Sequence, residues 1–311
     1  MSIALSFLRR RQRPIAHAVV GARRYCESPK RGRDAWDDAA FADEWSHGGG
    51  VNRTNPNRQM QLHLLGTLAA DSCVAHMRSR SGSAPRILDL GVGSGLAARS
   101  LLDVLPPQAS VVGVDSSLAM LNLLHGHHGH NRLTGLHIGF DELESHRAAL
   151  LRPGKFACVV AVQSLHEVDD YTKRRALSFA RSALAPGGSL YILDRFNFDR
   201  ASPLHADHAS MWHALQTSPV GGMPWSEYVE CIGAKEDDAW SGPQQCVQLC
   251  REAGFFAECL YMAFNRFLVA ARPYYDVEHE AEVRHDFEAW RDAQMDKLGV
   301  PPSKPPRGTS K

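Results

Sequence analysis

The stretch from residue 86 to residue 95, RILDLGVGSG, decides the fold of this chain. An apolar strand pattern at Arg86–Leu90 leads into three glycines, and a helical pattern begins at Leu96. Glycines are needed where a ligand lies against a turn, because a side chain would block its approach. The backbone N–H groups at the start of the helix face the same place. The stretch therefore predicts a ligand site between the first strand and the first helix.

Strand and helix patterns alternate outward from this junction. Strands are predicted at Arg86–Leu90, Ser110–Asp115, Leu133–Gly139, Phe156–Val162 and Ser189–Asp194. Helices are predicted between them at Leu96–Leu105, Ser117–His125, Glu142–Leu150 and Thr172–Leu184. This alternation indicates right-handed crossovers and an α/β fold with a parallel, doubly wound sheet. A helix at Pro243–Ala253 and an antiparallel hairpin of Phe256–Phe264 and Arg266–Ala271 complete a domain that spans residues 86–273.

Three further segments flank or interrupt this domain. Residues 34–85 are predicted to form an N-terminal helical cap, whose longer helix is opened by Asn55 and Pro56. Residues 195–242 break the alternation and are predicted to be a lid-like insertion. Residues 274–311 read as a charged helix followed by a disordered, proline-rich tail.

Composition and charge limit the class of protein. The chain has 311 residues, 44% hydrophobic and 22% charged, which excludes collagen-like and low-complexity proteins. No apolar run reaches the roughly 18 residues of a membrane-spanning helix. Beyond residue 33 the chain carries 26 basic and 33 acidic side chains, and this acidic balance argues against an extended nucleic-acid surface. The sequence does not indicate an oligomeric state.

Residues 1–33 are strongly basic, with eight Arg and one Lys against the single acid Glu27. This composition, with an apolar side near the start, is typical of an organelle transit peptide and predicts a mitochondrial location. A plastid or cytoplasmic location is the alternative, with the leader then a disordered basic tail.

Neither cysteines nor histidines predict a metal site or a disulfide framework. The seven cysteines are scattered without a repeated short spacing. The histidine-rich stretch 125–130 follows the second helix, at the end of the sheet away from the glycine turn. No other carboxylate and histidine set has a dependable ligand spacing, so no metal is predicted.

The glycine turn alone does not separate a dinucleotide site from other nucleoside sites. Asp115 ends the second strand, where an acid accepts hydrogen bonds from ribose hydroxyls. However, Leu96 stands where the third glycine of a dinucleotide motif belongs. Asp89, two residues before the first glycine, would repel a pyrophosphate but suits a cationic ligand. These features favour a cationic nucleoside ligand over NAD.

At this point the chain resembles the class I S-adenosylmethionine-dependent methyltransferases of the small-molecule type. The similar segments are DLGVGSG, VVGVDSSLAML, FACVVAVQSLHEVDD, LAPGGSLYILD and EAGFFAECLYMAFNRFLVAARP, within residues 56–273. The resemblance implies a Rossmann-like fold of seven strands, mostly parallel with an antiparallel last strand. It also implies S-adenosylmethionine at the carboxyl ends of the first four strands.

The resemblance assigns residues to the cofactor. Those implied to surround it are Asp89, Gly91, Gly93, Gly95, Asp115, Ser116, Met120, Phe140, Asp141 and Gln163. Among them, Asp115 is expected to hold the ribose hydroxyls, while Met120 and either Phe140 or Asp141 lie near the adenine.

Acceptor residues are expected at the ends of the fourth and fifth strands, where open α/β sheets bind ligands. His166 is the candidate catalytic residue, since its imidazole can orient or deprotonate an acceptor. A histidine that only orders the loop is the alternative. Asp194, Arg195 and Trp225 are candidate substrate contacts, with Arg195 suited to a carboxylate or phosphate.

Three functions therefore remain open at the level of the sequence. Methyl transfer to a small molecule is the main expectation. A non-catalytic assembly or structural subunit that keeps the fold and binds the cofactor is the second. A nicotinamide-dependent reductase is the third, and the glycine spacing disfavours it.

Overall fold

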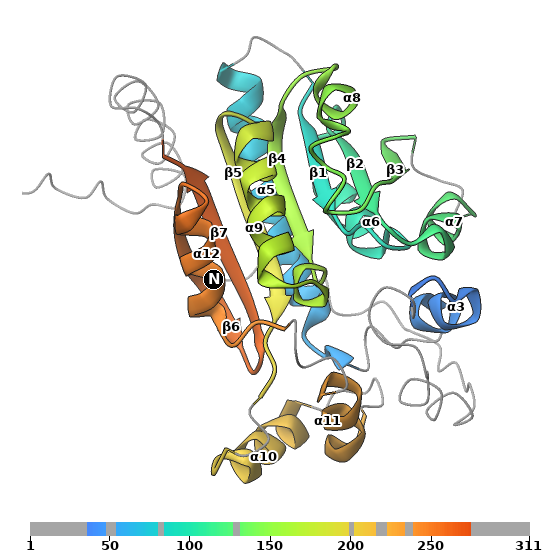
Figure 1. The fold of residues 1–311 in the computed structure, drawn as a ribbon, viewed down its shortest axis with the longest axis vertical. Helices are drawn as coiled ribbons and strands as arrows, with labels where there is room; N and C mark the ends of the chain where they lie inside the picture. Colours follow the sequence, from blue (N-terminus) through green and yellow to red (C-terminus); the bar gives the residue numbers. More distant parts are fainter. Residues whose placement is uncertain are drawn as a thin grey trace, which may run out of the picture.

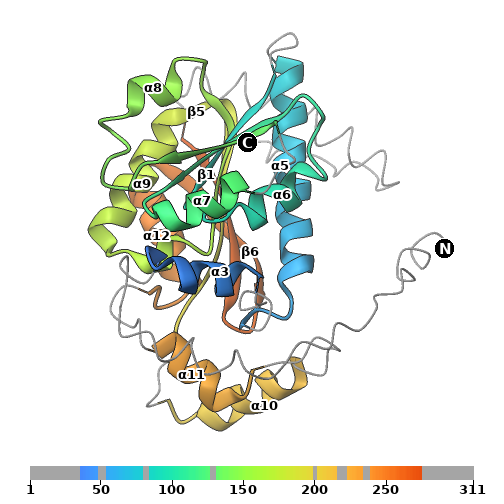
Figure 2. The same ribbon diagram turned by 90° about the vertical axis from the view of Figure 1, so that its right-hand side faces the viewer.

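The computed structural model describes residues 36–47, 54–79, 84–126, 131–198, 202–215, 223–233 and 239–274. They form a seven-stranded sheet with helices on both faces (Figures 1 and 2). The strand order is β3-β2-β1-β4-β5-β7-β6, in which β7 is antiparallel to both of its neighbours. This confirms the predicted α/β, doubly wound and mostly parallel sheet with an antiparallel last strand.

The strands agree closely with the sequence pattern. They are β1 (Arg86–Leu90), β2 (Ser110–Asp115), β3 (Leu133–His137), β4 (Phe156–Val162), β5 (Leu184–Arg195), β6 (Phe255–Ala263) and β7 (Arg266–Pro273). The strand β5 begins earlier than predicted, because Leu184 pairs with Phe156 before the Pro-Gly-Gly segment. The first six residues of β4, from Phe156 to Ala161, are buried, as expected of a central parallel strand.

Helices cover the two faces of the sheet. On one face lie α8 (Arg147–Leu151), α9 (Asp170–Ala183) and α12 (Pro243–Glu252). On the other lie α5 (Arg58–Ser79), α6 (Leu96–Leu102) and α7 (Leu118–Gly126). The helix α9 shows why these segments fold locally: Asp169 caps its first turn by accepting a hydrogen bond from the Thr172 N–H at 2.7 Å. Its small and apolar residues then face the sheet at helical spacing.

The predicted N-terminal cap separates into two parts with different roles. The helix α5 is a layer of the main domain, since Leu65 and Cys73 are buried in the same apolar cluster as Ile87. Its Ser72 hydroxyl lies 3.0 Å from the hydroxyl of Tyr191 on β5. The short helix α3 (Ala39–His47) instead lies beside α7, near the carboxyl ends of the strands (Figures 1 and 2).

Two helices occupy the predicted insertion 195–242, namely α10 (His205–Leu215) and α11 (Trp225–Gly233). They lie beyond the carboxyl ends of the parallel strands (Figure 1). Trp212 and Tyr228 are buried between them with their rings stacked at 3.8 Å. The hydroxyl of Tyr228 donates to Oδ1 of Asn265 at 2.8 Å, which ties the pair to the β6–β7 turn.

Several predictions lie outside the described residues: the leader 1–33, most of the histidine-rich stretch, and the C-terminal helix and tail. Within the described ranges, none of the helices combines the length and apolar character needed to cross a bilayer. No cluster of three or more potential metal ligands occurs in those ranges.

Candidate functional site

A cavity of about 410 Å³ opens at the carboxyl ends of β1, β2, β4 and β5, within the size range of small-molecule sites. Its floor is the glycine turn after β1 and the loops after β2, β3 and β4. This is the edge where parallel, doubly wound sheets bind ligands. The cavity thus lies at the edge of the sheet where the sequence pattern predicts a ligand site, and the binding of a ligand there stays a prediction.

The glycine turn is shaped so that backbone borders the cavity. Gly91 and Gly93 have φ angles of 77° and 53°, in the left-handed region that glycine adopts without strain. A Cβ at Gly91 would lie 2.4 Å from the Cβ of Ser164, so a larger residue would collide with the loop after β4. Both glycines line the cavity, and their contact with a cofactor stays a prediction.

Asp115 fixes this turn from the end of β2. Its Oδ2 accepts a hydrogen bond from the Gly93 N–H at 2.7 Å, and its Oδ1 accepts one from the Ser117 N–H at 2.9 Å. Burial raises the pKa of Asp115 above its usual value, while these two N–H groups oppose the rise. The carboxylate still borders the cavity, so each oxygen keeps lone pairs for a ligand.

Asp89 lies elsewhere than the motif implied. Its side chain is 1% exposed, does not line the cavity, and neither carboxylate oxygen has a hydrogen-bond partner. Burial and the nearby charge of Asp115 raise the pKa of Asp89 to about 7. The expected direct contact between Asp89 and a cofactor does not agree with this position behind the turn.

The remaining predicted cofactor residues also divide into those that line the cavity and one that does not. Those that line the cavity are Ser116, Met120, Phe140, Asp141 and Gln163. Gln163 has a φ of 53°, a conformation that is strained for a residue other than glycine and recurs at functional sites. Gly95 does not line the cavity; it begins α6, where a Cβ would meet the side chains of Arg99, Leu124 and Leu133.

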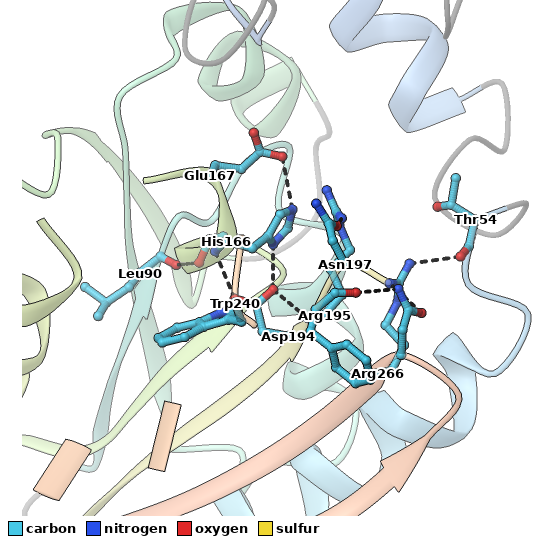
Figure 3. Close-up of polar contacts among 12 residues, drawn as sticks. Thr54, Leu90, His166, Glu167, Asp194, Arg195, Asn197, Trp240 and Arg266 are labelled. Atoms are coloured by element: carbon cyan, nitrogen blue, oxygen red, sulfur yellow. Dashed lines mark hydrogen bonds and ion pairs between the residues drawn. The ribbon is translucent and has the colours of Figure 1, made fainter. Parts of the chain in front are cut away.

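His166 lies in the cavity wall between two carboxylates (Figure 3). Its Nδ1 is 2.6 Å from Oδ1 of Asp194, and its Nε2 is 3.0 Å from Oε1 of Glu167. Both contacts are hydrogen bonds at the same time only when both ring nitrogens carry a proton. The ring is 5% exposed, so its orientation is fixed by these partners and by the surrounding chain.

Asp194 supports His166 from behind and does not reach the cavity. Its carboxylate also accepts hydrogen bonds from the N–H groups of His166 and Arg195 and from Nε1 of Trp240. Burial by itself raises the pKa of Asp194, but the charge and hydrogen bonds of His166, helped by Trp240, hold it below its usual value. The predicted substrate contact of Asp194 is therefore not what the geometry provides, since the carboxylate is fully buried.

Trp225 also lies away from the cavity. Its Nε1 donates to Nε2 of His205 at 3.1 Å, and its ring packs beside Tyr228 in the α10–α11 core. No described residue from 196 to 242 lines the cavity. The expected roof over the acceptor is thus not formed by the described part of the insertion.

Aromatic side chains from the N-terminal segment take that place instead. Trp36, Phe41 and Trp45 line the cavity, and their rings form one cluster with centroids 5.1–6.3 Å apart. The Ser117 hydroxyl donates to the Trp36 carbonyl at 2.7 Å and so joins this segment to the start of α7. The aromatic content was visible in the sequence, but its contact with the glycine turn depends on the tertiary fold.

Comparisons with known proteins agree with this architecture. Residues 87–188 match the family model described as "Methyltransferase domain". This match covers about a third of the chain and shows that this range is similar to a methyltransferase domain. A comparison with curated proteins gave no match.

Solved structures are similar in fold to this chain at low sequence identity. An O-methyltransferase family protein from Burkholderia thailandensis is 17% identical with a TM-score of 0.51, covering 77% of this chain and 61% of its own. Human N-acetylserotonin methyltransferase, solved in complex with SAM, is 14% identical with a TM-score of 0.42, covering 75% and 60%. The chain thus spans about 60% of the length of the solved chains it matches.

The cavity wall also contains arginines that the sequence analysis largely missed. Arg195 was predicted and lines the cavity, and Arg58 and Arg266 line it as well. Arg266 donates from one terminal nitrogen to the Thr54 carbonyl at 2.9 Å (Figure 3). The antiparallel pairing of β7 with β5 brings Arg266 here, and no local motif marks it.

Proposed function

We propose that this protein transfers a methyl group from S-adenosylmethionine to a hydroxyl group of a small molecule. The observation that carries the proposal is the position of His166. Its ring borders the same cavity as the glycine turn and Asp115, and Asp194 contacts its Nδ1 from behind. Donor-binding groups and a candidate base thus face one space.

The cavity suits the chemistry of the proposed cofactor. The Asp115 carboxylate can accept hydrogen bonds from both hydroxyls of a ribose. Met120 and Phe140 offer apolar surface to a purine, and the glycines leave room for backbone to approach the ligand. Bound S-adenosylmethionine supplies a methyl group on a sulfonium, an activated donor for an in-line displacement.

The chain's own contribution is positioning and proton transfer. A hydroxyl becomes a better nucleophile when a base removes its proton as the new bond to carbon forms. Asp194 favours the tautomer with the proton on Nδ1, which leaves Nε2 of His166 to accept the acceptor's proton. The resulting positive ring is stabilised by the same buried carboxylate.

Glu167 must release His166 for this step. Oε1 of Glu167 lies 3.0 Å from Nε2 of His166, where an acceptor would have to bind. The Glu167 side chain is 16% exposed and borders the cavity, so it has space to move away. An acceptor hydroxyl that takes the place of Glu167 at Nε2 would be correctly placed for deprotonation. The aromatic cluster of Trp36, Phe41 and Trp45 would then exclude water from the reaction.

The experiment is a labelled methylation screen. Wild-type protein is incubated with a metabolite extract and methyl-labelled S-adenosylmethionine, and products are identified by mass spectrometry. His166→Gln should lower turnover about tenfold to thousandfold while cofactor affinity stays within about twofold. His63→Gln, at an exposed position of α5, is the matched control and should leave both unchanged.

The alternatives predict different results in the same measurements. A non-catalytic cofactor-binding subunit would bind S-adenosylmethionine by calorimetry but give no labelled product. A reductase would bind a nicotinamide cofactor instead. If His166→Gln lowers cofactor affinity and melting temperature together with turnover, the residue orders its loop and the assignment as a base is wrong.

A further inference from the structure

Two arginines lie side by side in the cavity wall. Arg195 ends β5 and Arg266 begins β7, and the antiparallel register places them directly opposite each other. Residues in such a pair project to the same face of the sheet. They are 6% and 4% exposed, and both line the cavity near His166.

Neutral groups are the partners of both guanidinium groups. Arg195 donates to Oδ1 of Asn197 at 2.6 Å. Arg266 donates to Oδ1 of Asn265 at 3.2 Å and to the Thr54 carbonyl at 2.9 Å, while its buried Nε has no partner. Within the described ranges, neither guanidinium forms an ion pair with a carboxylate.

This arrangement is unfavourable without a ligand. Buried charges are ordinarily paired, and like charges directly opposite in a sheet repel each other. Burial lowers the pKa of Arg266, and the neighbouring charge of Arg195 lowers it further, although the Tyr228 hydroxyl opposes the change. Arg58, also in the cavity wall, has its pKa lowered to about 10 by burial. The charge of Asp194 also raises the pKa of Arg266, but that carboxylate is already bonded to His166 and Trp240, so the two guanidinium groups keep N–H donors for a further anion.

We propose that Arg195 and Arg266 together bind an oxyanion group of the methyl acceptor, a carboxylate or a phosphate. The forked N–H donors of a guanidinium group match the oxygens of both anions, and two such groups lie next to each other here. The acceptor is accordingly a hydroxylated organic acid or a hydroxylated phosphate ester. This substrate class rests on the proposed function, because it assumes that the acceptor occupies the wall beside His166.

The geometry gives each part of the acceptor its own partner. The oxyanion lies on the β5–β7 arginines, and the hydroxyl faces Nε2 of His166 at the end of β4. Anchoring the non-reacting end of the molecule fixes the reacting oxygen in position. A neutral analogue would leave two buried cations unpaired, so the pair also provides specificity.

The test uses minimal probes on protein saturated with S-adenosylhomocysteine. Benzoate, inorganic phosphate and the uncharged benzamide are titrated by calorimetry at constant ionic strength. We expect benzoate or phosphate to bind at least tenfold more tightly than benzamide, and their relative affinity distinguishes a carboxylate from a phosphate acceptor. Equal binding of charged and uncharged probes would overturn the proposal.

Variants locate the binding to the pair. Arg195→Gln and Arg266→Gln should each lower the affinity for the preferred anion at least tenfold. Arg195→Lys should lower it less, because lysine keeps the positive charge but lacks the forked N–H donors of arginine. Arg272→Gln removes the same charge from an exposed position of β7 and should bind normally. Anion affinity that is unchanged in the Arg195 and Arg266 variants would refute the assignment.

Two further outcomes of these titrations distinguish a failure of this inference from a failure of the proposed function. If Arg195→Gln weakens S-adenosylhomocysteine as strongly as the anion, the pair serves the cofactor's own carboxylate and the inference is wrong. If the wild type binds no S-adenosylhomocysteine, the proposed function fails, and the anion titration on cofactor-free protein still tests the arginines. The melting temperature of Arg195→Gln should equal or exceed that of the wild type, which shows that the variant folds.

Discussion

Asp115 has two tasks at one position, since it holds the glycine turn and borders the cavity. We expect Asp115→Asn to raise the dissociation constant of S-adenosylmethionine about 10- to 150-fold. This range corresponds to about 1.5–3 kcal/mol, the usual contribution of hydrogen bonds to a charged group. Isothermal titration calorimetry measures it, with Asp103→Asn at an exposed site as the control. Unchanged affinity in a folded variant would exclude Asp115 from the site.

Asp89 carries a prediction about stability and pH. Its pKa is about 7 in the folded chain against an unfolded value near 3.8. A carboxyl whose pKa is raised by folding binds its proton more tightly in the folded chain than in the unfolded chain. Its contribution to the free energy of unfolding is therefore complete below about pH 4 and is lost as the pH rises through about 7. The full difference is on the order of 4 kcal/mol.

Asp89→Asn should therefore stabilise the protein increasingly between about pH 4 and pH 7 and level off above. Urea unfolding of both proteins at pH 5 and pH 8 measures this, with the larger gain expected at pH 8. A difference that is the same at both pH values would show that Asp89 is ionised in the ordinary range and has a partner.

The sequence pattern predicted that both acids lie near the glycine turn, but it did not predict how each of them is buried. Asp89 and Asp115 were both expected at the ligand from their place in the strand–turn pattern. Only the structure shows that Asp89 lies behind the turn while Asp115 borders the cavity. Alternation along a strand fixes which residues share a face, but not where a turn places a side chain relative to a cavity.

Among the elements, α3 and the turn before it carry the aromatic cover of the cavity. Ala42 is the one buried residue of α3, so this helix adds little to the stability of the domain. We expect Trp36→Ala to weaken S-adenosylhomocysteine binding several-fold while the melting temperature changes by less than about 2 °C. The reason is that Trp36 lines the cavity, while its ring lies in the aromatic cluster of Phe41 and Trp45 outside the two large apolar clusters that cover the sheet.

Calorimetry and thermal melting on the same samples test the role of Trp36. Phe256→Ala, an exposed aromatic on β6, is the control for loss of aromatic surface. A large fall in melting temperature with unchanged affinity would instead make the α3 segment a structural support.

The bounds of elements with strong local patterns were predicted well. The segments that pack against one another around the cavity were not predicted. The bounds of β1, β2 and β4 agree with the sequence because apolar runs there end at turn residues. The cover of the cavity was expected from the lid-like insertion 195–242, yet the aromatic side chains that line the cavity there come from residues 36–45. Nothing local distinguishes an aromatic side chain that packs within its own helix pair from one that covers a distant turn.

For the whole molecule, the parallel, doubly wound sheet was the most informative prediction, because the carboxyl ends of parallel strands bring their loops to one edge. It placed His166, Asp115 and the glycine turn at one edge, as observed. Arg266 enters the same site only through the β5–β7 pairing, 71 residues along the chain from Arg195. The mitochondrial location inferred from residues 1–33 stays a prediction, since those residues lie outside the described ranges.

The sheet is shared by the two largest apolar clusters, one on each face, so we expect the domain to unfold in a single transition. A ligand that binds only the folded state at 100 times its dissociation constant stabilises it by about 2.7 kcal/mol. For a domain of this size that corresponds to a rise in melting temperature of about 5–10 °C. S-adenosylhomocysteine should produce this shift in the wild type, and a much smaller one in Asp115→Asn at the same concentration. NADH at an equal concentration should produce none, because the turn lacks the third glycine of a dinucleotide motif. Differential scanning calorimetry checks all three, and a shift with NADH but not with S-adenosylhomocysteine would reverse the assignment of the cofactor.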